Sequence, residues 1–135
     1  PKKMGREKFV TKDDVVVVRY GASAGFIGRG LDGILANNLF LVTPEIKELD
    51  KSYLYHYLNS NLAQTYLKQA MAGGAMPALS FGIVKELEIV IPPLAIQKQI
   101  VEKIEAERTL VESAKKLIEI YDQKTKDAIA KLWSE

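Results

Sequence analysis

Apolar positions along the first ninety residues come in short runs that glycines and prolines separate. The four consecutive valines of VVVVRY predict a strand over residues 14–20 that is covered on both faces. Residues 26–42 hold three glycines between short apolar pieces and a polar Asn-Asn break, which predicts a hairpin and then another strand that ends at Pro44. In ELEIVIPP, residues 86–93, apolar positions alternate, so we expect a further strand that the two prolines end.

Helical spacing begins at Asp50, a residue type that caps helix N-termini well. Apolar residues recur at intervals of three and four over residues 50–72. The sequence NSN at 59–61 favours a division into two helices, and the glycine pair at 73–74 ends the second. A short helical turn is expected around Ser80.

From Leu94 onward the chain contains neither glycine nor proline, which predicts one helix of about 60 Å. Its apolar residues repeat every seven positions, and such a stripe requires a second helix to cover it. The expected helix-pairing residues are Ile100, Ile104, Val111, Ala114, Ile118, Tyr121, Ala128 and Leu132. We therefore expect an α+β fold: a small mixed β-sheet domain with short helices over residues 1–93, followed by one long coiled-coil-forming α-helix over residues 94–135.

Composition narrows the class of protein. The 135 residues suffice for about one domain with its own core. Cysteine is missing, which excludes a disulfide scaffold and thiolate metal or redox sites. The longest apolar runs are far shorter than a membrane span, so we expect no membrane partner and a cytoplasmic location. Because the chain begins Pro-Lys-Lys, we expect it to be a piece of a longer protein.

Basic residues concentrate near the start of the chain, although the net charge is only +2. Among the first thirty residues, three are acidic and seven are basic, namely Lys2, Lys3, Arg6, Lys8, Lys12, Arg19 and Arg29. Such a concentration is typical of a surface that contacts phosphates, and a solvated face explains it equally well.

The stretch VVVVRYGASAGFIGRG invites comparison with nucleotide-binding loops. A Walker loop requires Lys-Ser or Lys-Thr after its last glycine, whereas Phe26 and Ile27 follow Gly25. The dinucleotide fingerprint requires G-x-G-x-x-G opening a helix, and this spacing differs. The single histidine, His56, makes no usual zinc site without cysteines, and no catalytic constellation is visible. We expect no enzyme, no cofactor and no metal site.

The stretch IVIPPLAIQKQIVEKIEA carries a family resemblance. A strand, then Pro-Pro-Leu, then Gln97 in a long heptad helix resembles the specificity subunit of type I restriction-modification systems. Upstream, VVVVRYGASAGFIG, NNLFLVTP, SYLYHYL and the later glycine loop resemble the target recognition domain of that family. Two departures are visible. Ile96 stands where the family usually has a glutamate, and the chain holds at most the later part of one recognition domain plus one helix.

The resemblance implies that the chain is a non-catalytic part of a DNA-recognition subunit. In the family, each target recognition domain reads half of a bipartite site, and the long helices pair antiparallel and set the spacing between halves. Methyltransferase (modification) and restriction subunits assemble with them. The implied partners are therefore double-stranded DNA, these subunits, and a second copy through the long helix. Our candidate DNA-binding residues are Lys2, Lys3, Arg6 and Arg29 for phosphates, and Arg19, Tyr20, Ser23, Lys68 and Gln69 near the two glycine loops for closer readout.

The alternative is a coiled-coil dimerisation or adaptor module that binds protein rather than DNA. The heptad stripe would then be its whole function. Affinity for DNA that falls steeply with salt concentration would favour the first reading, and no binding at low salt would favour the second.

Overall fold

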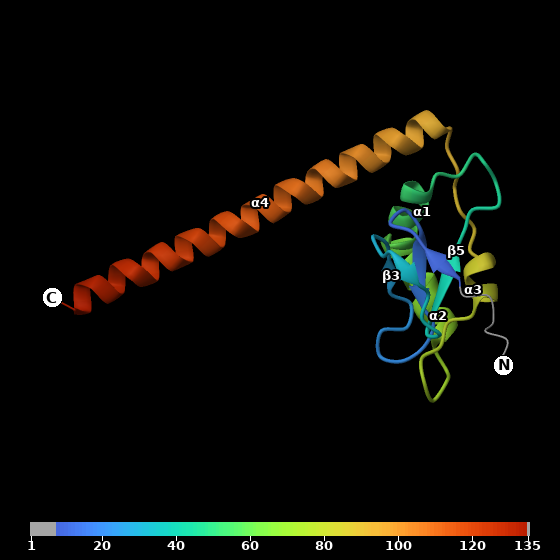
Figure 1. The fold of residues 1–135 in the computed structure, drawn as a ribbon, viewed down its shortest axis with the longest axis horizontal. Helices are drawn as coiled ribbons and strands as arrows, with labels where there is room; N and C mark the ends of the chain where they lie inside the picture. The colour runs from blue at the N-terminus through green and yellow to red at the C-terminus, as the bar shows by residue number, and fades with distance from the viewer. Residues whose placement is uncertain (1–7, 135) are drawn as a thin grey trace. The chain divides into compact units, whose positions relative to one another are not determined.

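The computed structural model describes residues 8–134, and the chain divides after Lys98 into two compact units (Figure 1). Within the described residues, the first unit contains the strands and the short helices, and most of one long helix forms the second. The α+β class expected from the sequence is confirmed.

The centre of the first unit is β2 (Val15–Val18), the middle strand of a three-stranded sheet with the order β3-β2-β5. It pairs antiparallel with β3 (Ile27–Gly28) and with β5 (Leu39–Val42). Val15 and Val17 are fully buried on one face, and Val16 is 3% exposed on the other. The prediction of a strand covered on both faces is therefore confirmed. The sheet was expected to be mixed, and every described strand pair is antiparallel.

A separate two-stranded sheet joins β1 (Phe9–Val10) to β4 (Gly33–Ile34). The hairpin predicted within residues 26–42 is therefore wrong, because β3 and β4 belong to different sheets. The Gly30 amide donates to the Lys12 carbonyl at 2.9 Å, which draws the chain towards β1 before a hairpin can close. A strand of two residues has no periodicity from which it could have been predicted.

The three short helices begin where the sequence places a capping side chain. They are α1 (Lys51–Leu58), α2 (Asn61–Met71) and α3 (Phe81–Lys85), capped by Asp50, Ser60 and Ser80. Each capping oxygen accepts hydrogen bonds from backbone amides in the first turn of its helix. The predicted cap, the division of the helical segment and the later helical turn are confirmed.

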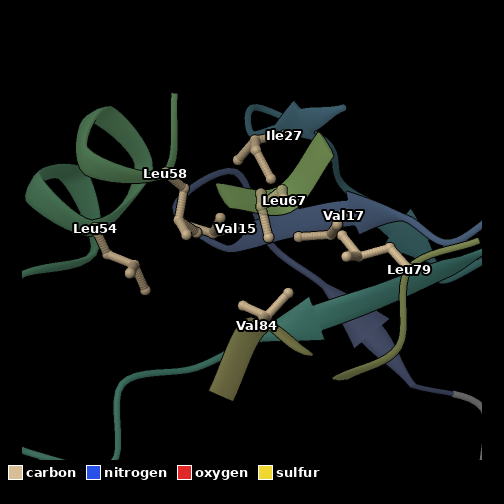
Figure 2. Close-up of a cluster of buried hydrophobic side chains, with 8 residues drawn as sticks. All are labelled: Val15, Val17, Ile27, Leu54, Leu58, Leu67, Leu79 and Val84. Atoms are coloured by element: carbon tan, nitrogen blue, oxygen red, sulfur yellow. The ribbon is translucent and has the colours of Figure 1, made fainter. Parts of the chain in front are cut away.

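These helices cover one face of the central sheet, where the core of the first unit lies (Figure 2). Burying each large aliphatic side chain stabilises the fold by about 1.5–3 kcal/mol. The core cluster consists of Val15, Val17, Ile27, Leu54, Leu58, Leu67, Leu79 and Val84. The cluster joins β2 to α2. One glycine-containing loop follows β2, and the other follows α2.

The strand predicted over residues 86–93 is wrong, because this segment has no regular secondary structure. Two of its carbonyls are taken by tyrosine hydroxyls of α1 instead of a neighbouring strand. Tyr53 donates to the Val90 carbonyl at 2.7 Å, and Tyr57 donates to the Glu88 carbonyl at 3.2 Å. Burial of the Tyr53 ring raises the pKa of its hydroxyl, which keeps this donor protonated.

Gln97, in the first turn of α4 (Leu94–Trp133), is completely buried and fully hydrogen-bonded. Its Nε2 donates to the carbonyls of Glu48 at 2.5 Å and Pro92 at 2.7 Å, and its Oε1 accepts from the Asp50 amide at 2.9 Å. One side chain thus joins the proline pair, the start of α4 and the cap of α1. This network gives a physical reason for a glutamine after Pro-Pro-Leu.

The second unit is the remainder of α4, a single uninterrupted helix. Its heptad residues are exposed, with Val111 at 53%, Ile118 at 61% and Leu132 at 75%. No helix within the described residues is long and apolar enough to cross a lipid bilayer.

Candidate nucleic-acid interface

The two glycine loops lie side by side on the first unit. One loop follows β2 and the other follows α2, and we call residues 19–25 together with residues 72–79 the loop pair. The Gly21 amide donates to the Pro77 carbonyl at 3.2 Å, and the Leu79 amide donates to the Arg19 carbonyl at 2.6 Å. Tyr20 also forms an antiparallel bridge with Ala78. Segments about fifty residues apart in sequence therefore present one surface.

Gly25 ends the first loop in a backbone conformation that favours glycine. Its φ of +86° lies in the region that L side chains avoid. A Cβ atom placed there would also stand 2.9 Å from the Cε atom of Met71, at the end of α2. The backbone angle therefore favours glycine, whereas the flexible end of the Met71 side chain can move to admit a Cβ atom.

We expect the change Gly25→Ala to destabilise the first unit by about 1–2 kcal/mol, the cost of the left-handed conformation for a residue with a Cβ. The matched control is Gly82→Ala, since Gly82 lies in α3 without a positive φ and a Cβ there meets Ser80 Oγ at an ordinary 3.7 Å. Urea denaturation followed by circular dichroism measures both changes. Equal midpoints for the two variants would contradict this role of Gly25.

The five residues assigned to closer readout lie on two elements that meet where Gly25 approaches Met71. Arg19, Tyr20 and Ser23 are exposed on the loop that follows β2. Lys68 and Gln69 are exposed in the last turn of α2, next to Met71. All five side chains are therefore accessible to a ligand, three on the loop that follows β2 and two on the last turn of α2.

Arg19 and Tyr20 act as a pair within that surface. The guanidinium carbon of Arg19 lies 5.8 Å from the centre of the Tyr20 ring, and the Tyr20 hydroxyl donates to the Asn37 carbonyl at 3.1 Å. The ring is thereby fastened to the turn before β5, while 44% of the residue stays exposed. A guanidinium over a fixed ring is more ordered than one on a free side chain, which favours directional contacts.

Arg29, the phosphate candidate that falls within residues 8–134, lies apart from the loop pair. The Arg29 guanidinium carbon lies 4.4 Å from the centre of the Tyr55 ring, and its Nη1 donates to Ser52 Oγ at 3.2 Å. Arg29 is half-buried and contacts α1 rather than the loop pair. Lys2, Lys3 and Arg6 lie outside the described residues.

Lys51, which was not among the candidates, forms an ion pair at the start of α1. Lys51 Nζ lies 2.6 Å from Asp14 Oδ1, and the amide and hydroxyl of Thr11 donate to the other oxygen. The hydrogen bonds from Lys51 and then Thr11 lower the pKa of Asp14 below its usual value. The charge of Lys51 is therefore compensated by Asp14 within the first unit.

Sequence reasoning missed the turn that adjoins the loop pair. Residues 36–39 form a turn closed by a hydrogen bond from the Leu39 amide to the Ala36 carbonyl at 3.0 Å, and Arg19 donates its amide to the Asn38 carbonyl at 2.8 Å. The sequence had indicated these two asparagines only as a polar break. Within the described residues, no group of three or more His, Cys, Asp or Glu side chains is placed to hold a metal ion.

Within the described residues, a small α+β unit that presents paired loops is followed by a long helix with an exposed heptad stripe. The family model described as "Type I restriction modification DNA specificity domain" matches residues 5–120. The chain therefore belongs to that family, and the resemblance carried by its Pro-Pro-Leu junction is confirmed.

Two relatives illustrate the match. The specificity subunit of the type I restriction enzyme MjaVIII from Methanocaldococcus jannaschii is 28% identical over 130 residues, which cover 96% of this chain and 30% of that protein. The crystal structure of the HsdS subunit from Thermoanaerobacter tengcongensis has a similar fold, with a TM-score of 0.67 at 24% identity, over 86% of this chain and 31% of that one. The chain thus spans about a third of the length of these relatives.

Proposed function

We propose that this chain is part of a non-catalytic specificity subunit and recognises one half of a bipartite DNA site. The loop pair contacts the duplex, and the long helix pairs with a second helix to set the distance between half-sites. Methyltransferase and restriction subunits assemble with this module in the cytoplasm, where the DNA that it reads lies. Family membership supports this proposal.

The observation that carries the proposal is the juxtaposition of the two glycine loops. DNA readers combine cations that contact phosphates with polar side chains that reach base edges, and the loop pair together with the last turn of α2 offers both. Arg19 and Lys68 supply the charge, and Ser23 and Gln69 supply neutral hydrogen-bonding groups. Arg29 stays a proposed phosphate contact. It would lie at the periphery of the DNA interface, because its guanidinium contacts α1 and not the loop pair.

Changing Arg19 and Lys68 together to alanine is expected to weaken binding to a duplex at low salt by about a hundredfold or more, because charge-assisted contacts contribute about 1.5–3 kcal/mol each. Loss of two phosphate contacts also lowers the slope of log affinity against log salt concentration by about two. Fluorescence anisotropy with a labelled duplex at several salt concentrations measures both quantities.

The matched control removes the same charge from the other unit. Lys116 and Lys126 are exposed on α4 and lie off its heptad stripe, so their joint change to alanine is expected to leave affinity and slope nearly unchanged. Equal effects of the two double changes would mean that only total charge matters. Undetectable binding of the unmodified chain at low salt would contradict the proposed function and favour the protein-binding adaptor.

The exposed heptad residues of α4 support pairing with a second copy, and the charge along the helix favours an antiparallel pair. Residues 99–112 include two basic and four acidic residues, a net charge of −2, and residues 113–134 include five basic and three acidic residues, a net charge of +2. An antiparallel pair places each negative half beside a positive half, whereas a parallel pair places like charges together. The second copy then supplies the second recognition surface.

The helix stripe also supports the adaptor as a second candidate function. An exposed heptad stripe is a complete protein-binding element by itself, since coiled-coil pairing requires only the apolar seam and its flanking charges. The adaptor reading predicts self-association without affinity for DNA, and the salt titration above separates the two functions.

A further inference from the structure

We infer that the turn at residues 36–39 is a third DNA-reading element, in which Asn37 and Asn38 contact the base edges of an A·T pair in the major groove. The inference rests on the proposed function and deepens it, because it names residues that read sequence. Three observations carry it: the turn is adjacent to the loop pair, its backbone is fixed, and its amide side chains are available.

The turn is bonded directly to the loop pair through its carbonyls. Arg19 donates its backbone amide to the Asn38 carbonyl at 2.8 Å, and Tyr20 donates its hydroxyl to the Asn37 carbonyl at 3.1 Å. Arg19 and Asn37 also line the same open hollow on the surface of the first unit. The turn and Arg19 would therefore contact the same part of a bound duplex.

The backbone of the turn is fixed while its side chains are not. The hydrogen bond from Leu39 to Ala36 closes the turn, and β5 begins immediately after it and pairs with β2. Both asparagines are exposed, and among residues 8–134 neither side-chain amide makes a hydrogen bond. A turn whose backbone is already fixed, and whose side-chain amides are available for hydrogen bonds, can bind DNA bases with little loss of conformational entropy.

The chemistry of the amide selects the base. An asparagine side chain offers one donor and one acceptor side by side, which matches N7 and N6 of adenine in the major groove. We therefore expect the half-site to contain an adenine that the turn contacts, beside a phosphate that Arg19 contacts.

A base-analogue experiment with the full chain tests this assignment. Duplexes with a randomised core are selected with the unmodified protein, and the enriched duplex is then made with 7-deazaadenine, which lacks the N7 acceptor. We expect the substitution to weaken binding of the unmodified protein by about fivefold or more, the effect of losing a good base contact. The double variant Asn37→Ser with Asn38→Ser is expected to bind both duplexes equally.

Serine is chosen because it also favours turns, so the variant separates base readout from turn formation. Asn61→Ser is the matched control, since Asn61 is an exposed asparagine in the first turn of α2. If the double serine variant still discriminates against 7-deazaadenine, or if selection enriches no sequence although binding remains salt-sensitive, the inference is overturned and the proposed phosphate contacts stand. If the unmodified protein binds no duplex at low salt, the proposed function itself fails.

Discussion

We expect the chain to self-associate through α4, and we expect the change Ile118→Glu to convert it into a monomer at tens of micromolar. Ile118 lies in the middle of the heptad stripe and is 61% exposed in the single chain, so a paired helix would bury it. Burial of an isoleucine side chain is worth about 1.5–3 kcal/mol, and each pair contains two of them. The total of about 3–6 kcal/mol corresponds to a loss of affinity of roughly a hundredfold to ten-thousandfold. Sedimentation equilibrium measures it.

The matched control is Ile120→Glu, which makes the same chemical change about 200° around the helix. Ile120 is 50% exposed and lies off the heptad stripe, so this variant is expected to associate as the unmodified protein does. Loss of association in both variants would contradict pairing through the stripe, and a monomeric unmodified protein would contradict self-association altogether.

Orientation of the pair is measured with one spin label, since the chain has no native cysteine. With a cysteine introduced at Glu102, an antiparallel pair centred on the heptad stripe places the two labels about 40 Å apart along the helices. A parallel pair places them about 10–20 Å apart. The shorter distance would contradict the argument from the opposite charges of the two halves of α4.

The sequence predicted the elements whose signal is local. Four valines in a row require burial on both faces, and Asp50, Ser60 and Ser80 each offer a side-chain acceptor at the start of a helix. These features act within a few residues, so they can be recognised without knowing the rest of the fold. The long helix was predictable for the same reason, because forty residues without glycine or proline leave few alternatives.

The elements that were missed depend on contacts between distant residues. The segment at 86–93 alternates like a strand, but the hydroxyls of Tyr53 and Tyr57 take the carbonyls that a neighbouring strand would use. β1 consists of two residues and exists through its pairing with β4. Alternation measures only which side chains face inward, and it does not identify the hydrogen-bonding partner of the backbone.

The sequence indicated which residues could belong to the candidate site, but it did not show that the two glycine loops lie side by side. Glycines in both loops indicated tight turns, but the hydrogen bonds that join the loops span more than fifty residues of sequence. Arg19 and Arg29 are equivalent in the sequence, and packing separates them: one lies exposed beside the loop pair and the other stacks on Tyr55. The adjacent turn was missed because Asn-Asn has the same turn preference whether or not it contacts a ligand.

The change Gln97→Met is expected to lower the free energy of unfolding of the first unit by about 2–4 kcal/mol. Methionine fills a similar volume but cannot replace the three hydrogen bonds to Glu48, Asp50 and Pro92, each worth about 0.5–1.5 kcal/mol. Backbone groups left without a partner near a buried side chain add to the loss. For a unit of this size the melting temperature falls by about 10 °C or more. Circular dichroism at 222 nm would also report the unfolding of α4. Thermal denaturation is therefore better followed by near-ultraviolet circular dichroism, to which Tyr53 and Tyr57 of the first unit contribute.

Gln99→Met is the matched control, because Gln99 is exposed two residues further along the same helix. It makes none of the side-chain hydrogen bonds found among the described residues, so its replacement is expected to change stability by less than about 0.5 kcal/mol. If both variants melt together with the unmodified protein, the buried amide contributes nothing beyond its packing. If only Gln97→Met melts early, the hydrogen bonds of this glutamine stabilise the junction between the proline pair, the start of α4 and the cap of α1.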